Sequence, residues 1–165
     1  MLGGVNMGLF SKDNSIIKDN FKLIESVGGL PEGNMYVLSL YDDKLTIKNP
    51  LIKTTVELKY EQITDVFYGI ETEISTHNKS VIKRALVGGL LFGGIGAVVG
   101  AVDGTGTKEK KSKHFYFIIS YKSSSGEDAY IQFEDVRLYQ GSKLAKKLKE
   151  LCRIEDTVSS DTVQL

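Results

Sequence analysis

The stretch HFYFIISYKSSSGEDAYIQF, residues 114–133, decides the fold. Residues 114–122 and 128–133 are runs rich in aromatic and β-branched side chains, and the polar sequence SSSGE separates them at 123–127. Such runs favour strands, and a short break rich in Ser and Gly is typical of a turn between them. This stretch therefore predicts two successive strands joined by a turn.

Five more strand candidates precede this pair at short spacing. Tyr36, Leu38 and Leu40 alternate with other residues on one face of the second candidate, while Gly, Pro and Asn-Pro break the chain between candidates. A parallel sheet would need long crossover connections, and nothing between the first five candidates is long enough. The sequence predicts an all-antiparallel sheet with earlier strands at 21–27, 35–41, 44–48, 54–58 and 63–74.

The last predicted element is an amphipathic helix. Ser142 can cap it, and Leu144, Leu148 and Leu151 fall on one apolar stripe. The lysines of this segment lie off that stripe and are expected in water: Lys143, Lys146, Lys147 and Lys149. We expect a domain at 16–153 between a flexible N-terminus, 1–15, and a flexible tail, 154–165.

Composition excludes several classes of function. The 165 residues carry 21 basic and 21 acidic side chains, and zero net charge disfavours nucleic-acid binding. Cys152 is the only cysteine, which excludes an intramolecular disulfide and a cysteine zinc site. We expect no metal, no cofactor and no catalytic residues, because no nucleophile, base and orienting group occur in a recognisable pattern.

Several polar residues have a plain interpretation at this level. His77 and His114 flank the least polar part of the chain and are interpreted as surface histidines. The acidic pairs Asp42-Asp43 and Glu134-Asp135 are interpreted as solvated groups at turns and strand ends.

The least polar part is ALVGGLLFGGIGAVVGAV, residues 85–102, which lacks any charged or polar side chain. As a helix it would be about 27 Å long, slightly less than the roughly 30 Å hydrocarbon core of a bilayer. Bulky apolar side chains suited to membrane insertion cover much of it: Leu90, Leu91, Phe92, Ile95, Val98, Val99 and Val102.

The glycines of this segment form a stripe. On a helix the set would fall within roughly an 80° arc, with repeated G-x-x-x-G spacing that lets another backbone approach closely: Gly89, Gly93, Gly96, Gly100 and Gly104. Each glycine costs a water-exposed helix about 1 kcal/mol relative to alanine, so lipid or packed protein must compensate. A membrane segment, a packed hairpin and a non-helical Gly-rich loop remain open.

Basic residues flank the segment on both sides. They are candidates for contact with anionic headgroups, where each gains roughly 1 kcal/mol: Lys83, Arg84, Lys108, Lys110, Lys111 and Lys113. Because both flanks are basic, the positive-inside rule orients no single span, whereas a re-entrant hairpin would return both ends to one side.

The glycines also suggest an enzyme motif. Residues 94–100 match G-x-G-x-x-x-G, a variant of the dinucleotide fingerprint. That motif requires a βαβ unit and an acidic residue about 20 positions on. The neighbouring strands are antiparallel and the downstream region is basic, so we do not adopt this interpretation.

Seven short strands followed by an amphipathic helix resemble the pleckstrin-homology (PH)-like fold, an open barrel with one end capped by its C-terminal helix. The closest resemblance is to bacterial and phage proteins with a PH-like or GRAM-like barrel. The sequence ITDVFYG, residues 63–69, resembles their fifth strand. The insertion at 79–113, a Gly-rich helix or hairpin before the sixth strand, departs from the usual pattern.

The resemblance and the insertion together suggest a non-enzymatic module that self-associates and engages an anionic membrane through the Gly-rich segment. The alternative is a soluble oligomeric scaffold that binds a protein partner, with the segment packed within or between subunits. We expect a cytoplasmic location, at the inner face of the membrane if the segment binds lipid.

Overall fold

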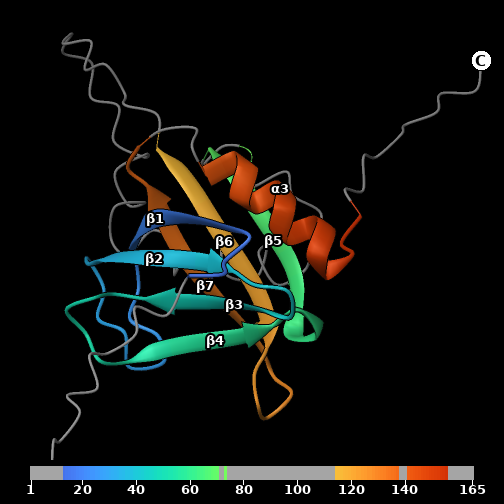
Figure 1. Ribbon diagram of the computed structural model, residues 1–165, viewed down its shortest axis with the longest axis horizontal. Helices are drawn as coiled ribbons and strands as arrows, with labels where there is room; N and C mark the ends of the chain where they lie inside the picture. The colour runs from blue at the N-terminus through green and yellow to red at the C-terminus, as the bar shows by residue number, and fades with distance from the viewer. Residues whose placement is uncertain (1–12, 71–72, 74–113, 138–140, 156–165) are drawn as a thin grey trace, which may run out of the picture.

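The computed structural model describes residues 13–70, 73, 114–137 and 141–155, and Figure 1 shows how their elements are arranged. Seven antiparallel strands form one sheet, in the order β4-β3-β2-β1-β7-β6-β5. The helix α3 (Gly141–Cys152) follows the last strand, which confirms the predicted fold class. The strands are β1 (Ile17–Leu23), β2 (Met35–Leu40), β3 (Lys44–Lys48), β4 (Thr55–Lys59), β5 (Ile63–Ile70), β6 (Phe115–Lys122) and β7 (Asp128–Asp135), and the short 3-10 helix η1 (Tyr60–Gln62) precedes β5.

The sheet consists of two meanders, β1–β4 and β5–β7. The ladder that joins them is short: Lys22 pairs with Glu134 and Leu23 with Phe133, and the Ile24 N–H donates to the Gln132 carbonyl at 3.0 Å. In Figure 1 the strands β2–β4 run across the direction of β5 and β6, so the sheet bends strongly at this junction. β4 and β5 are the two edges, which leaves the barrel open.

The inward faces of both meanders share one hydrophobic core. Phe21 of β1 stacks on Phe117 of β6 with ring centroids 5.1 Å apart, and Phe133 of β7 lies 6.2 Å from Phe21. Leu144 and Leu148 of α3 are fully buried in this core, as their spacing predicted. The aromatic cluster therefore bridges the meanders where backbone pairing is sparse.

The first strand differs from its prediction. It runs from Ile17 to Leu23 and not from 21 to 27, because its polar first half pairs with β2 from Ile17–Leu40 onward. After Leu23 the chain turns through Gly28, whose φ of +57° favours glycine, and Val27 forms an isolated bridge with Leu30. Residues 24–27 therefore belong to a turn.

Two other predicted boundaries move because carboxylates bind backbone amides. β5 ends at Ile70, whose N–H donates to Glu73 Oε2 over 3.1 Å, and the predicted extension to 74 is wrong. The helix begins at Gly141, whose N–H donates to Asp135 Oδ2 over 2.9 Å, and Ser142 is the second residue of its first turn.

The helix ends with a hydrogen-bond pattern that a left-handed residue permits. Arg153 has a φ of 55°, and its N–H donates to the Glu150 carbonyl, while the Ile154 N–H donates to the Lys149 carbonyl. These bonds form a Schellman motif, which satisfies carbonyls of the last turn. Ile154 packs against the core cluster just beyond it.

Gly141 lies at the closest approach of α3 to the barrel. A Cβ atom there would lie 2.6 Å from Phe21 Cε1 and 2.7 Å from Tyr68 Cε2, well inside contact distance. We expect Gly141→Ala to lower the free energy of unfolding by about 1–3 kcal/mol in urea titrations, because the helix must shift away from two rings. The exposed neighbour Lys143 is the control, and Lys143→Ala should change stability by less than about 0.5 kcal/mol. Equal stability of both variants would contradict this packing.

Candidate functional site at the base of the Gly-rich insertion

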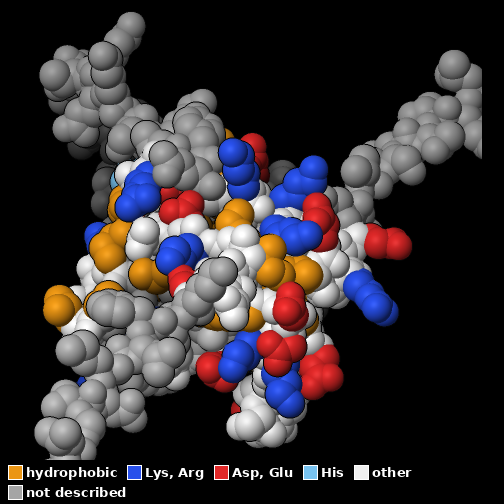
Figure 2. Space-filling model, in the orientation of Figure 1, with side chains coloured by type: hydrophobic (Ala, Val, Ile, Leu, Met, Phe, Trp, Pro, Cys, Tyr) orange, Lys and Arg blue, Asp and Glu red, His pale blue; other side chains and the backbone are white. Residues whose placement is uncertain are grey.

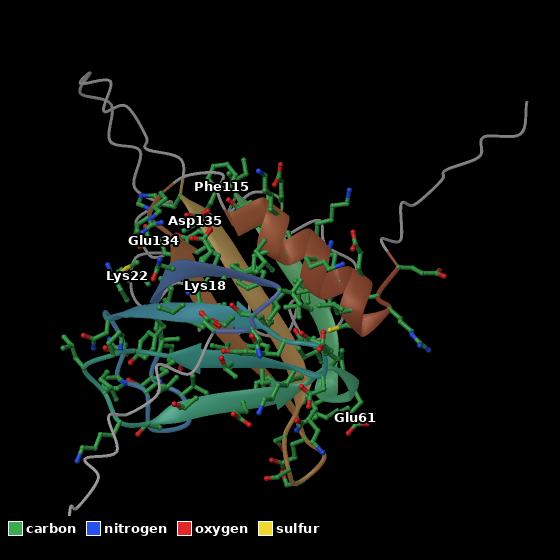
Figure 3. The ribbon with its side chains drawn as sticks, viewed as in Figure 1. Lys18, Lys22, Glu61, Phe115, Glu134 and Asp135 are labelled. Atoms are coloured by element: carbon green, nitrogen blue, oxygen red, sulfur yellow. The ribbon has the colours of Figure 1, made fainter. Side chains whose placement is uncertain are left out.

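The insertion leaves the barrel after β5 and returns at β6. Ile70, the last residue of β5, pairs with Phe115, the first residue of β6. Both ends of the insertion are therefore attached at one end of two neighbouring strands. Figure 3 shows Phe115 near Glu134, Asp135 and Lys22 at this end, with Glu61 at the opposite end of the barrel.

Asp135 organises the backbone beside this attachment point. It is the last residue of β7 and is only 2% exposed. Its Oδ2 accepts hydrogen bonds from the Tyr68 hydroxyl at 2.7 Å and the Gly141 N–H at 2.9 Å, while Oδ1 accepts from the Arg137 N–H at 3.0 Å. One carboxylate thus ties together β5, β7 and the start of α3. The interpretation of Asp135 as a solvated strand-end residue is wrong, because these three donors replace water.

Its neighbour Glu134 points to the other face of β7. Glu134 Oε1 lies 2.6 Å from His114 Nδ1, and Oε2 lies 3.8 Å from Lys22 Nζ. His114 is the residue just before β6, so this contact links the returning end of the insertion to β7 and β1. The His114 side chain is about half exposed, which agrees with a surface histidine, but the carboxylate gives it a specific position.

Aromatic side chains of β5 and β6 pack against one another at the same end of the barrel. Tyr68 of β5 stacks on Phe115 with ring centroids 5.7 Å apart, and it lies 6.4 Å from the buried Phe117. Such ring pairs add about 0.5–1.5 kcal/mol beyond the area they bury. The two strands that carry the insertion are thus held by side chains as well as by their backbone ladder.

Most strand lysines of the described barrel face a carboxylate. The contacts are Lys18 with Asp13 at 2.5 Å, Lys44 with Glu57 at 2.9 Å and Lys122 with Asp128 at 2.6 Å. Figure 2 shows basic and acidic side chains intermixed on the visible face. The described residues that precede α3 carry 8 basic and 14 acidic side chains, so the described barrel is net acidic.

A groove of about 770 Å³ lies outside β1–β3, lined by Lys18, Ser39, Tyr41, Thr46 and Lys48 among others. The hydrogen bond from Lys18 holds the pKa of the Asp13 carboxyl down at about 2 and raises the pKa of Lys18. Lys18 is thus already engaged by an anion of the protein. The groove is therefore less suited to bind an external anion than the presence of Lys18 and Lys48 alone would indicate.

The chain's cysteine is not an activated nucleophile. Cys152 is half-buried against the core, and burial raises the pKa of its thiol to about 12. The thiolate is the reactive form, so this sulfur is almost wholly protonated at neutral pH. Among the described residues no group of His, Cys, Asp and Glu side chains could hold a metal ion.

The residues that the sequence singled out for membrane contact and glycine packing all lie outside the described residues. These are the basic flanks Lys83, Arg84, Lys108, Lys110, Lys111 and Lys113, together with the apolar and glycine positions between 89 and 104. In the part of the chain that the structure describes, no helix is both long and apolar enough to cross a bilayer. His77 also falls outside this part.

The fold and the position of the insertion define the class of protein: a PH-like open barrel with a long Gly-rich insertion between β5 and β6. A family model described as "Glycine zipper containing PH domain" matches residues 30–135, and the chain belongs to that family. This confirms the PH-like resemblance, and PH domains are in general non-catalytic modules for membrane or protein interaction. Neither a curated protein nor a solved structure matches the chain.

Sequence reasoning missed Glu134, Asp135 and Tyr68 as the residues that hold the base of the insertion. A signal was present, because an aspartate ends a strand six residues before the first residue of a helix, where a carboxylate can accept the free N–H groups of the helix. The Tyr68 contact had no such signal, since 67 residues separate Tyr68 from Asp135.

Asp135 provides a direct test of this arrangement. Asp135→Ala should lower the free energy of unfolding by about 2–4 kcal/mol, because it leaves buried donors without an acceptor. Tyr68→Phe removes one of these bonds and should cost about 1 kcal/mol, which urea unfolding can resolve. Glu61, with 79% of its side chain exposed, is the control, and Glu61→Ala should stay within about 0.5 kcal/mol. A loss for Asp135→Ala no larger than the control would refute the anchoring role.

Proposed function

We propose that this protein is a non-enzymatic PH-like module that self-associates and engages anionic membranes through residues 83–113. The observation that carries the proposal is the pairing of Ile70 with Phe115, which attaches both ends of the insertion at one point of a rigid barrel. The membrane segment must therefore begin and end on the same side of a bilayer.

This constraint argues against a single crossing. Neighbouring antiparallel residues lie about 5 Å apart, whereas one crossing of the hydrocarbon core would separate the ends of the segment by about 30 Å. The returning flank would then have to carry Lys108, Lys110, Lys111 and Lys113 back through hydrocarbon, where each charge is costly. Peripheral insertion or a shallow re-entrant hairpin satisfies the attachment without that cost.

The basic flanks supply the electrostatic part of binding. The strand lysines of the described barrel are largely ion-paired, so the barrel surface has little net attraction for an anionic leaflet. Residues 79–113 carry seven basic and two acidic side chains. Because their attraction is screened by salt, binding is expected to weaken as ionic strength rises.

The glycine stripe supplies the self-association part. Gly89, Gly93, Gly96 and Gly100 have the small-residue spacing that allows two backbones to approach closely. Several copies on one membrane would each contribute a basic flank, and multivalent attachment strengthens binding without new contacts.

Flotation with vesicles tests the membrane claim. We expect the wild-type chain to float with vesicles of phosphatidylcholine and phosphatidylserine, and to lose at least about tenfold in bound fraction when Lys108, Lys110, Lys111 and Lys113 are all changed to Glu. The matched control changes the four lysines of α3, Lys143, Lys146, Lys147 and Lys149, to Glu. Equal losses in both variants, or no flotation of the wild type, would end the proposal.

A second candidate function is a soluble oligomeric scaffold that binds a protein partner, with the Gly-rich segment packed within or between subunits. The outward-facing apolar residues Phe67 and Ile118 favour it, because both are buried although neither belongs to the barrel core.

Light scattering after size exclusion, in detergent micelles that replace the bilayer, tests self-association through the glycines. We expect a discrete oligomer for the wild type and a smaller mass for Gly96→Leu, because a leucine holds the two backbones apart. Ala97→Leu adds the same bulk beside the stripe and is expected to have a weaker effect. An unchanged mass for Gly96→Leu would argue against a close-packed glycine interface.

A further inference from the structure

The outward side of β5–β7 is unusually apolar for a barrel surface. Phe67 of β5 is directly paired with Ile118 of β6, and Gly69 is paired with Tyr116. Phe67, Tyr116 and Ile118 are 6%, 7% and 0% exposed, yet none of them belongs to the core cluster. We call these residues, together with Ser120 and Gln132 beside them, the outer face.

The described helix does not account for this burial. Leu144, Ala145 and Leu148 of α3 pack into the core on the inward side, and the outer face lies on the other side of the same strands. Residues alternate between the two sides of a strand, so Phe117 and Ile119 point into the core while Tyr116 and Ile118 point away from it.

The outer face also contains polar groups that need a partner. The carboxamide Nε2 and Oε1 of Gln132 and the Oγ of Ser120 are buried, and within the described residues they have no hydrogen-bond partner. Gln132 is 1% exposed and is paired across the ladder with Ile118. An unsatisfied buried group costs about 1–3 kcal/mol, so the occupant of this face is expected to supply both a donor and an acceptor.

We infer that residues 85–102 of the same chain pack on the outer face, with their glycine-rich backbone against Gln132 and Ser120. A peptide group offers one N–H and one C=O, which complement the carboxamide Oε1 and Nε2 of Gln132. Glycine has no side chain to hold its backbone away from the sheet, whereas the bulky residues between the glycines can cover Phe67 and Ile118.

The attachment of the segment favours the same molecule over a second copy. Residues 71–113 start from β5 and end at β6, the two strands that carry most of the outer face. The outer face from Tyr116 to Ser120 is only about 13 Å long at about 3.3 Å per residue, so each flank easily reaches it. Such a tether gives an effective concentration in the millimolar range, far above a micromolar second copy.

This inference goes beyond the proposed function, because it concerns where the segment rests when no membrane is present. Membrane insertion then has to displace the segment from the outer face, and the basic flanks at 83–84 and 108–113 supply the attraction for that step. The test below contains no lipid, so its failure and the failure of membrane binding can be told apart.

Thiol labelling on the full chain tests the inference. In a Cys152→Ala background, Ser120→Cys reports on the outer face, and Ser39→Cys, on the outward side of β2, is the matched control. We expect maleimide to label Ser120→Cys at least tenfold faster when Leu91→Glu and Val98→Glu are added to the segment. The rate at Ser39→Cys should change less than twofold.

A crosslink between the segment and the outer face provides the second measurement, and it changes the segment only from alanine to cysteine at one position. Ser120→Cys combined with Ala97→Cys should give, with a short bis-maleimide, a product of monomer mass whose yield does not depend on protein concentration. A product of dimer mass would assign the outer face to a second copy and overturn the inference. Fast labelling of Ser120→Cys beside the native segment, or labelling that the two glutamates leave unchanged, would also overturn it.

Discussion

The packing of Phe21 against Phe117 and Phe133 is the interaction on which the rest of the structure depends. Backbone contact between the two meanders is limited to a short stretch of β1 and β7, two paired residues and one further hydrogen bond from Ile24, so side-chain packing has to support the bend between them. The three rings, together with Leu144 and Leu148 of α3, fill the angle between the meanders. Because Gly141 lies directly against Phe21, the helix packs this closely on the barrel only while its first residue lacks a side chain.

The same packing places the base of the insertion. With α3 seated on Phe21 and Tyr68, the start of the helix comes within hydrogen-bond distance of Asp135, and Asp135 in turn fixes Tyr68 beside Phe115. The ends of β5 and β6 are thereby held together, and a long apolar insertion leaves and re-enters the barrel at one place. Both flanks of the insertion therefore join the barrel at the paired residues Ile70 and Phe115.

Local patterns predicted most of the barrel. Alternation at Tyr36, Leu38 and Leu40, and the two strong runs around the SSSGE turn, identified strands because side-chain period and turn chemistry are local properties. The first half of β1 was missed because its residues are mostly polar and become a strand only by pairing with β2. The end of β5 was missed because the Glu73 carboxylate, and not a breaker residue, takes the amide of Ile70.

By itself, the sequence determined the class of fold, the apolar stripe of the last helix and the existence of a Gly-rich segment between basic flanks, since each is a property of neighbouring residues. Only the tertiary structure decided that Asp135 is a buried anchor, that both ends of the insertion meet at Ile70 and Phe115, and that Gln132 and Ile118 form a buried outward side. These features join residues far apart in the chain. A local sequence pattern cannot predict which distant groups will replace water around a given side chain.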